Sequence, residues 1–206
     1  MLDFIKQLTD PQSIIHYGGL WLLLFVVFAE TGLLVGFFLP GDSLIFISGL
    51  LCATKPDLLN TSLIELLILL MLAAIIGNIF GYWFGKKMGE RLYNRKDSFL
   101  FRKQHLITTK AFYDKHGGKA LVLGRFLPII RTFAPILAGV IKSDFKVFML
   151  YNIIGAVAWI GSIASAAYFL GKQFPQIENY IGYIVIGLIV VTTIPVALTY
   201  MKNRKK

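Results

Sequence analysis

Six apolar runs constrain this 206-residue chain more than any other feature of its sequence. A helix needs about 20 mainly apolar residues to cross a bilayer core of about 30 Å, and most of the runs reach that length. The hydrophobic fraction of 56% and the mean hydropathy of +0.69 exceed those of soluble domains. The sequence therefore predicts an all-α integral membrane protein with a single membrane domain over residues 1–206. The runs cover residues 13–29, 31–54, 62–85, 119–141, 147–171 and 180–201.

The net charge of +10 is concentrated in two segments. Residues 86–119 hold a run of Lys and Arg with few acids among them, and the tail over residues 202–206 is also basic. Segments rich in Lys and Arg stay on the cytoplasmic side of a membrane. We therefore expect both segments to be cytoplasmic, and we expect no nucleic-acid partner. The basic residues of the first segment are Lys86, Lys87, Arg91, Arg95, Lys96, Arg102, Lys103, Lys110, Lys115 and Lys119.

The run over residues 119–141 is predicted to enter the membrane without crossing it. Three apolar runs separate the two basic segments, and an even number of crossings must join two segments on the same side. The last two runs are long and nearly free of charge, whereas 119–141 is interrupted by Pro128 and Pro135. Proline lacks the backbone donor that a helix needs, so it breaks helices. We expect a re-entrant hairpin that turns near Pro128 to Arg131.

The first half of the chain repeats this pattern in the opposite orientation. Phe38-Leu39-Pro40 in the run over 31–54 matches Phe126-Leu127-Pro128 in the later run, and Pro40 and Gly41 are its expected break. Interrupted segments at matching places in two halves are typical of transporters with inverted repeats and a site near the bilayer midplane. The predicted fold is an inverted repeat with two opposed re-entrant helical hairpins and about four spanning helices.

The basic linker over residues 86–118 has aromatic and aliphatic residues between its charges. This mixture is typical of an amphipathic helix at the membrane interface, although a solvated connector fits it nearly as well.

Small and polar residues inside the apolar runs indicate helix packing. Asn78 and Asn152 lie in the similar segments GNIFGYW and YNIIGAVAW, and we expect them to form hydrogen bonds between helices as supporting polar residues. Glycine recurs at every fourth position near Asn78, which predicts a face for close contact with a neighbouring helix. These glycines are Gly77, Gly81, Gly85 and Gly89.

Four ionisable residues lie within or beside the two predicted hairpins: Glu30, Asp42, Arg125 and Arg131. Charges at membrane depth are expensive and usually functional, although two structural salt bridges would be the simpler explanation. Guanidinium groups suit phosphate oxygens, so Arg125 and Arg131 are candidate phosphate-binding residues. Glu30 and Asp42, each under opposing effects of burial and nearby arginines, are candidate proton-coupling residues in one polar pocket.

Motifs for enzymatic chemistry are not found in the sequence. It has no nucleotide-binding G-x-x-x-x-G-K-[ST] loop, no G-x-S-x-G elbow and no H-E-x-x-H zinc helix. Its three histidines lack the spacing of metal ligands. We therefore expect a protein that is not an enzyme and that uses neither a cofactor nor a metal.

The order of the motifs resembles the DedA family of membrane proteins, which carries a VTT or SNARE-associated-type domain. The resemblance spans residues 28–159 in collinear order and is most specific at Glu30 with P-G-D at 40–42 and at G-R-x-x-P-x-x-R over 124–131. Asn78 departs from a common family pattern that has an aspartate there. The matching segments are FAETGLLVGFFLPGDSLIFISGLL, GNIFGYWFGKKMG, FYDKHGGKALVLGRFLPIIRTFAPILAGV and FKVFMLYNIIGAVAW.

The resemblance implies a multi-pass protein of the bacterial cytoplasmic (inner) membrane that translocates lipids. Family members recycle undecaprenyl phosphate, a polyprenyl phosphate carrier, and depend on the proton motive force. They use an acidic pair matching Glu30 and Asp42 and an arginine pair matching Arg125 and Arg131. The alternatives are a phosphatidylethanolamine flippase, a lipid scramblase, or a structural protein of envelope assembly. A homodimer and a monomer both remain open.

Overall fold

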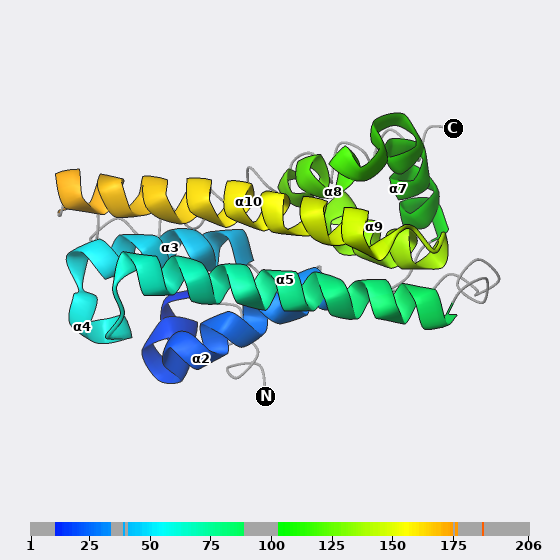
Figure 1. Cartoon of the computed structure of the whole chain (residues 1–206). Helices are drawn as coiled ribbons and strands as arrows, with labels where there is room; N and C mark the ends of the chain where they lie inside the picture. The colour runs from blue at the N-terminus through cyan, green and yellow to red at the C-terminus, as the bar shows by residue number, and fades with distance from the viewer. Residues whose placement is uncertain are drawn as a thin grey trace. The chain divides into compact units, whose positions relative to one another are not determined.

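The computed structural model describes residues 11–33, 39, 41–88 and 103–174, with the single positions 176 and 187. Over these residues the chain is helical and contains no strand, which confirms the predicted all-α class (Figure 1). The predicted last span over 180–201 lies almost wholly outside the described residues. The α-helices are α2 (Pro11–Gly32), α3 (Gly41–Thr54), α4 (Pro56–Leu59), α5 (Leu63–Met88), α7 (Lys103–His116), α8 (Ala120–Leu123), α9 (Pro128–Val140) and α10 (Phe145–Gln173). Two 3-10 turns, η2 (Gly117–Lys119) and η3 (Gly124–Phe126), flank α8.

Helices α5 and α10 have the length and composition of membrane spans. They contain 26 and 29 residues, so each is longer than the roughly 20 residues that cross a bilayer core. Large apolar side chains are exposed along one face of α5 at every fourth position, where lipid is their natural surrounding. These exposed residues are Ile64, Ile68, Leu72, Ile76 and Phe80.

The contacts of the chain gather into two compact units, which are described separately. The first unit contains the beginning of α2, helices α3 and α4, the beginning of α5 and the end of α10. The second contains the end of α2, most of α5, helices α7 to α9 and the larger part of α10.

In the first unit, α3 is packed closely against the end of α10. A side chain added at Gly49 would collide with the backbone of Ala164, and one added at Gly171 would meet Leu50 Cδ1 at 2.8 Å. Gly41 and Asp42 lie in the first turn of α3. Pro40, the other half of the expected break, lies outside the described residues.

Helix α2 is interrupted at Gly19, where φ is 54° and ψ is −151°. This conformation is accessible to glycine and strained for other residues. The apolar run over 13–29 is therefore divided at Gly19, with an apolar helix from Gly19 to Gly32 after the kink.

In the second unit, the glycine face of α5 contacts α2 and α9, as the four-residue spacing predicts. Gly77 touches Thr31 and the backbone near Gly32, whereas Gly85 faces the backbone of Ile136. On the other side of this contact, Gly139 of α9 lies against the backbone of Tyr82 and Lys86 in α5. Because these residues are small, the backbones of the neighbouring helices can come into direct contact. Gly89 lies outside the described residues.

The run over 119–141 is divided at Leu127, which is extended between η3 and α9 (φ −117°, ψ 109°). Pro128 begins α9, a position where the missing N–H has no cost. Arg131 is therefore helical and does not belong to a turn. The expected break at Pro135 is also absent: α9 continues through Pro135 to Val140.

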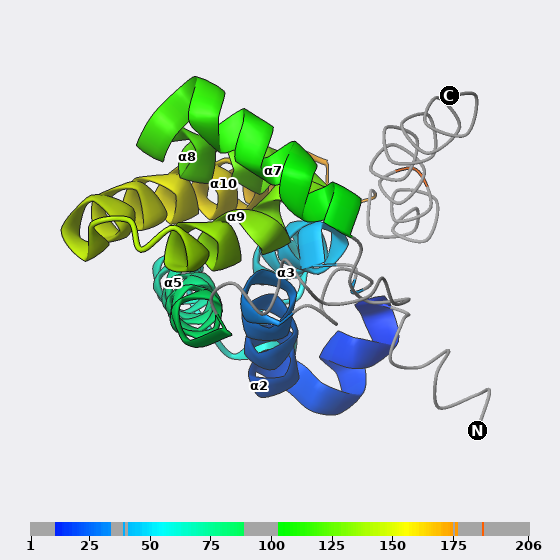
Figure 2. The same ribbon diagram turned by 90° about the vertical axis from the view of Figure 1, so that its right-hand side faces the viewer.

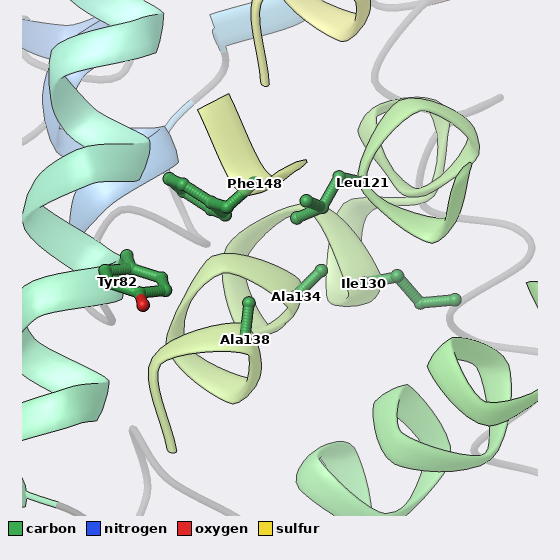
Figure 3. Packing of buried hydrophobic residues seen from close by; sticks show 6 residues of the cluster. All are labelled: Tyr82, Leu121, Ile130, Ala134, Ala138 and Phe148. Carbon is green, nitrogen blue, oxygen red and sulfur yellow. The ribbon is translucent and has the colours of Figure 1, made fainter. Parts of the chain in front are cut away.

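Helix α7 packs against α9 beside α8 (Figure 2). Its residues Phe112 and Tyr113 contact the core cluster shown in Figure 3, which joins α5, α8, α9 and α10. The end of the predicted linker is thus a helix docked on protein, while Ile107 is 55% exposed. Its placement at a membrane surface stays a prediction. The residues of the core cluster are Tyr82, Leu121, Ile130, Ala134, Ala138 and Phe148.

Candidate functional site

Arg125 is buried in the second unit, with only 1% of its surface exposed. It lies in η3, just before the extended Leu127. Its Nη2 donates hydrogen bonds to the side-chain Oδ1 of Asn152 (2.6 Å) and to the backbone oxygen of the same residue (3.2 Å). Its Nε and Nη1 have no hydrogen-bond acceptor among the described residues. Arg125 is therefore a buried cation whose hydrogen-bonding capacity is only partly used.

Asn152 connects Arg125 to α5. Its Nδ2 donates to the backbone oxygen of Ile75 at 3.2 Å. The Asn78 amide can donate to Asn152 Oδ1 at 2.9 Å. In the reversed amide orientation, Asn78 instead donates to the Thr31 carbonyl (3.2 Å) and accepts from Arg125 Nη2 (2.9 Å). In either orientation the Asn78 amide has a polar partner outside α5: Asn152 of α10 in the first, and Thr31 of α2 with Arg125 in the second.

Arg131 forms an ion pair with Glu30. The two residues come from α9 and α2, and the bond joins Nη2 of Arg131 to Oε1 of Glu30. Thr132 adds a long hydrogen bond of 3.4 Å from its hydroxyl to the Glu30 backbone oxygen. Both charged side chains are buried, so this is an internal ion pair that links the end of α2 to the start of α9.

The two arginines share an aromatic neighbour that the sequence analysis did not single out. The guanidinium carbon of Arg125 lies 5.6 Å from the ring centroid of Trp159, and that of Arg131 lies 4.8 Å away. Both distances fall within the range of cation–π attraction. The signal in the sequence was the spacing of Asn152, Gly155 and Trp159, which places all three on one face of a helix.

The structure brings together three of the four charged residues that the sequence nominated: Glu30, Arg125 and Arg131. Asp42 lies in the first turn of α3 in the other unit, and it is half-buried there. No group of three or more His, Cys, Asp or Glu side chains suited to a metal ion occurs among the described residues. The arginine cluster combines two guanidinium groups, one carboxylate and neutral amides, and guanidinium N–H groups are strong hydrogen-bond donors to anions.

Long apolar helices with exposed apolar side chains and a buried cationic cluster are typical of a helical membrane protein. Residues 39–169 match the VTT domain model, and the chain belongs to this family, which includes the DedA proteins. It is 36% identical to Protein DedA of Escherichia coli K12 over 209 aligned residues, covering 100% of this chain and 94% of that protein. The expected family is thereby confirmed.

For two other relatives, the alignment covers a smaller share of the relative's own length. An uncharacterized membrane protein of Mycobacterium tuberculosis is 35% identical over 84% of this chain and 74% of the relative. Inner membrane protein YqjA of Escherichia coli K12 is 32% identical over 82% of this chain and 74% of YqjA. No solved structure matches the chain significantly.

Proposed function

We propose that this protein moves a lipid with a phosphate headgroup between the leaflets of the bacterial inner membrane, with a polyprenyl phosphate such as undecaprenyl phosphate as substrate. Arg125 carries this proposal. A buried guanidinium that keeps Nε and Nη1 without an acceptor among the described residues has two donor nitrogens, with three N–H groups, to offer to a ligand. Phosphate oxygens match these donors in charge and geometry.

The two arginines have different roles in this proposal. Arg125 is held by the amide oxygen and the backbone oxygen of Asn152, so these contacts position it without neutralising its charge. Arg131 is paired with the carboxylate of Glu30. Arg125 is then the permanent anchor of the headgroup, and Arg131 exchanges its carboxylate partner for the phosphate.

The same exchange provides a route for proton coupling. Protonation of Glu30 weakens its ion pair with Arg131, which frees the guanidinium for the phosphate. Release of the lipid allows the proton to leave and the ion pair to form again. Asp42 is proposed as the second acid of this cycle. The proton motive force would drive transport through these steps.

The membrane arrangement proposed for this cycle is the inverted repeat, with two opposed re-entrant hairpins and about four spanning helices. The extended Leu127 between η3 and α9 supports a broken segment in the second repeat. Irregular backbone at membrane depth is tolerated where it is buried in protein or lines a cavity. In this topology the basic segment after α5 and the basic tail are cytoplasmic.

A fluorescent short-chain polyprenyl phosphate in proteoliposomes tests the substrate. We expect the wild type to move it under an imposed pH gradient, and Arg125→Ala and Arg131→Ala to lose transport while remaining folded. Lys146→Ala is the matched control, because it removes an exposed cation outside the cluster. If the wild type is no faster than empty liposomes, the substrate is wrong. Movement of labelled phosphatidylethanolamine instead would favour the alternative flippase or scramblase.

The ion pair itself favours one alternative, a structural role in envelope assembly. If Glu30 and Arg131 serve only to join α2 and α9, exchanging the charges with Glu30→Arg and Arg131→Glu restores function, since the pair is kept. For a phosphate site the exchange fails, because the cation is then on α2 and Arg125 has lost its neighbour. Growth of a cell that depends on this protein would distinguish the two.

A further inference from the structure

Trp159 is the contact that Arg125 and Arg131 have in common. Its side chain is among the largest fully buried side chains in the described part of the chain, with 1% of its surface exposed. Arg125 lies in the 3-10 turn η3 and Arg131 lies near the start of α9. The extended Leu127 lies between these two elements. Both guanidinium groups nevertheless lie within 6 Å of one indole ring.

Like charges repel, so two buried guanidinium groups need a reason to remain close. The negative face of an aromatic ring attracts a cation, and indole attracts it more strongly than phenol or benzene does. The attraction is strongest when water is excluded, as it is at this buried ring. Trp159 therefore favours the presence of both cations without taking away the charge of either.

The surrounding face of α10 is built around Arg125. Asn152 accepts two hydrogen bonds from its Nη2, and Gly155 leaves the space beside its side chain, since an added Cβ would lie 3.0 Å from Nε. Trp159 is the next large residue on this face, one turn beyond Gly155. One helix face thus supplies an acceptor, a space and a ring to the same guanidinium.

We propose that Trp159 is a positioning residue that fixes the separation of Arg125 and Arg131, so that the two guanidinium groups receive a single phosphate monoester. This inference rests on the proposed function and adds to it the residue that sets the geometry of the site. The ring also allows binding to be followed by fluorescence, because an anion bound to both arginines changes the electrostatic field at the indole.

Fluorescence tests the proposal without changing Trp159. The chain has three tryptophans, so Trp21→Phe with Trp83→Phe leaves Trp159 as the only tryptophan, which can be excited selectively over tyrosine. In detergent, a soluble short-chain isoprenyl monophosphate should change the emission in a saturable way, whereas the corresponding uncharged isoprenol should not. Arg125→Ala in this background should abolish the response. An unchanged emission at saturating monophosphate overturns the proposal.

Transport kinetics separate positioning from packing. Removing the ring with Trp159→Leu should raise KM about tenfold with little change in kcat, and Trp159→Phe, which keeps an aromatic face, should recover most of the affinity. The matched control is Trp83→Leu, since Trp83 lies 4.9 Å from the Lys86 ammonium outside this site. It should transport as the wild type does.

Each outcome has a distinct meaning. If Trp159→Leu keeps the wild-type KM while Arg125→Ala is inactive, the proposed function stands and the role of Trp159 is wrong. Equal loss in the Leu and Phe variants would also refute positioning by the ring and would indicate packing alone. If the wild type neither binds the monophosphate nor moves the lipid, the proposed function and this inference both fail. The fluorescence experiment decides the question if Trp159→Leu does not fold.

Discussion

Arg131 and Glu30 form a buried ion pair although 101 positions separate them in the sequence. The bond connects α9 to the end of α2, and it places an acid beside one of the two arginines of the cluster. Arg125, six positions before Arg131, has only neutral hydrogen-bond acceptors among the described residues. This asymmetry underlies the different roles proposed for the two arginines.

Glu30→Gln should destabilise the protein by about 3 kcal/mol, because it removes the charged partner of a buried arginine. The expected measurement is thermal unfolding in detergent, combined with Arg131→Gln in a double-mutant cycle. Glu65→Gln is a control, since that exposed acid interacts with Ser62 at the surface. Additive effects of the two cluster substitutions would show that the pair contributes no coupling energy.

The same Glu30→Gln variant should lose the pH dependence of transport. A glutamine cannot take up the proton that the proposed cycle requires. Initial flipping rates between pH 6 and pH 8 would measure this. A pH profile identical to the wild type would exclude Glu30 as the coupling acid.

Asn152→Leu should cost about 2 kcal/mol, because Nη2 of the charged Arg125 loses its side-chain acceptor. Asn152→Asp keeps an acceptor oxygen and adds a charge that neutralises Arg125. The Asp variant should therefore retain most of the thermal stability and lose transport. Equal transport by the Asp variant and the wild type would contradict a role for the positive charge of Arg125.

Gly139→Ala should destabilise the protein by about 1–3 kcal/mol through overpacking. An added Cβ would lie 2.7 Å from the Lys86 backbone nitrogen and would collide with the Tyr82 carbonyl, and helix backbones cannot move independently. Gly161→Ala is the matched control, because its nearest contact is Met71 Cε at 3.7 Å. Thermal unfolding of the two variants should separate them; equal midpoints would mean that α5 and α9 separate easily.

Asp144 should make stability depend on pH at the start of α10. Backbone hydrogen bonds from Val147 and Lys146 lower the pKa of this carboxyl below its ordinary value. The folded pKa is the lower one, so the stabilisation is present above about pH 4 and is lost as the pH falls through the folded pKa. Asp144→Ala should thus be less stable than the wild type at pH 7 and should approach it in acid. Asp144→Asn keeps a capping oxygen and should remove this pH dependence. Unfolding midpoints measured across the range would test both variants.

Local patterns in the sequence predicted several features because their causes lie within a few residues. The glycine at every fourth position of α5 predicted a close contact between helices, and the structure places Gly77 and Gly85 against the backbone of neighbouring helices. Pro128 predicted a break, which falls at Leu127 with Pro128 as the first residue of α9. Pro135 did not break the helix: within α9 only one backbone donor is lost, and the surrounding helix packing supports the rest of the turn.

The sequence by itself determined the membrane class, the helical secondary structure, the family and the nomination of Glu30, Arg125 and Arg131. Hydropathy, helical period and motif order are readable along the chain, since each depends on residue type and spacing. Only the tertiary structure decided that Glu30 pairs with Arg131, that Asn152 holds Arg125 and that Trp159 lies beside both arginines. Those contacts depend on how α2, α9 and α10 are rotated against one another, and that rotation is set by packing between residues far apart in the sequence.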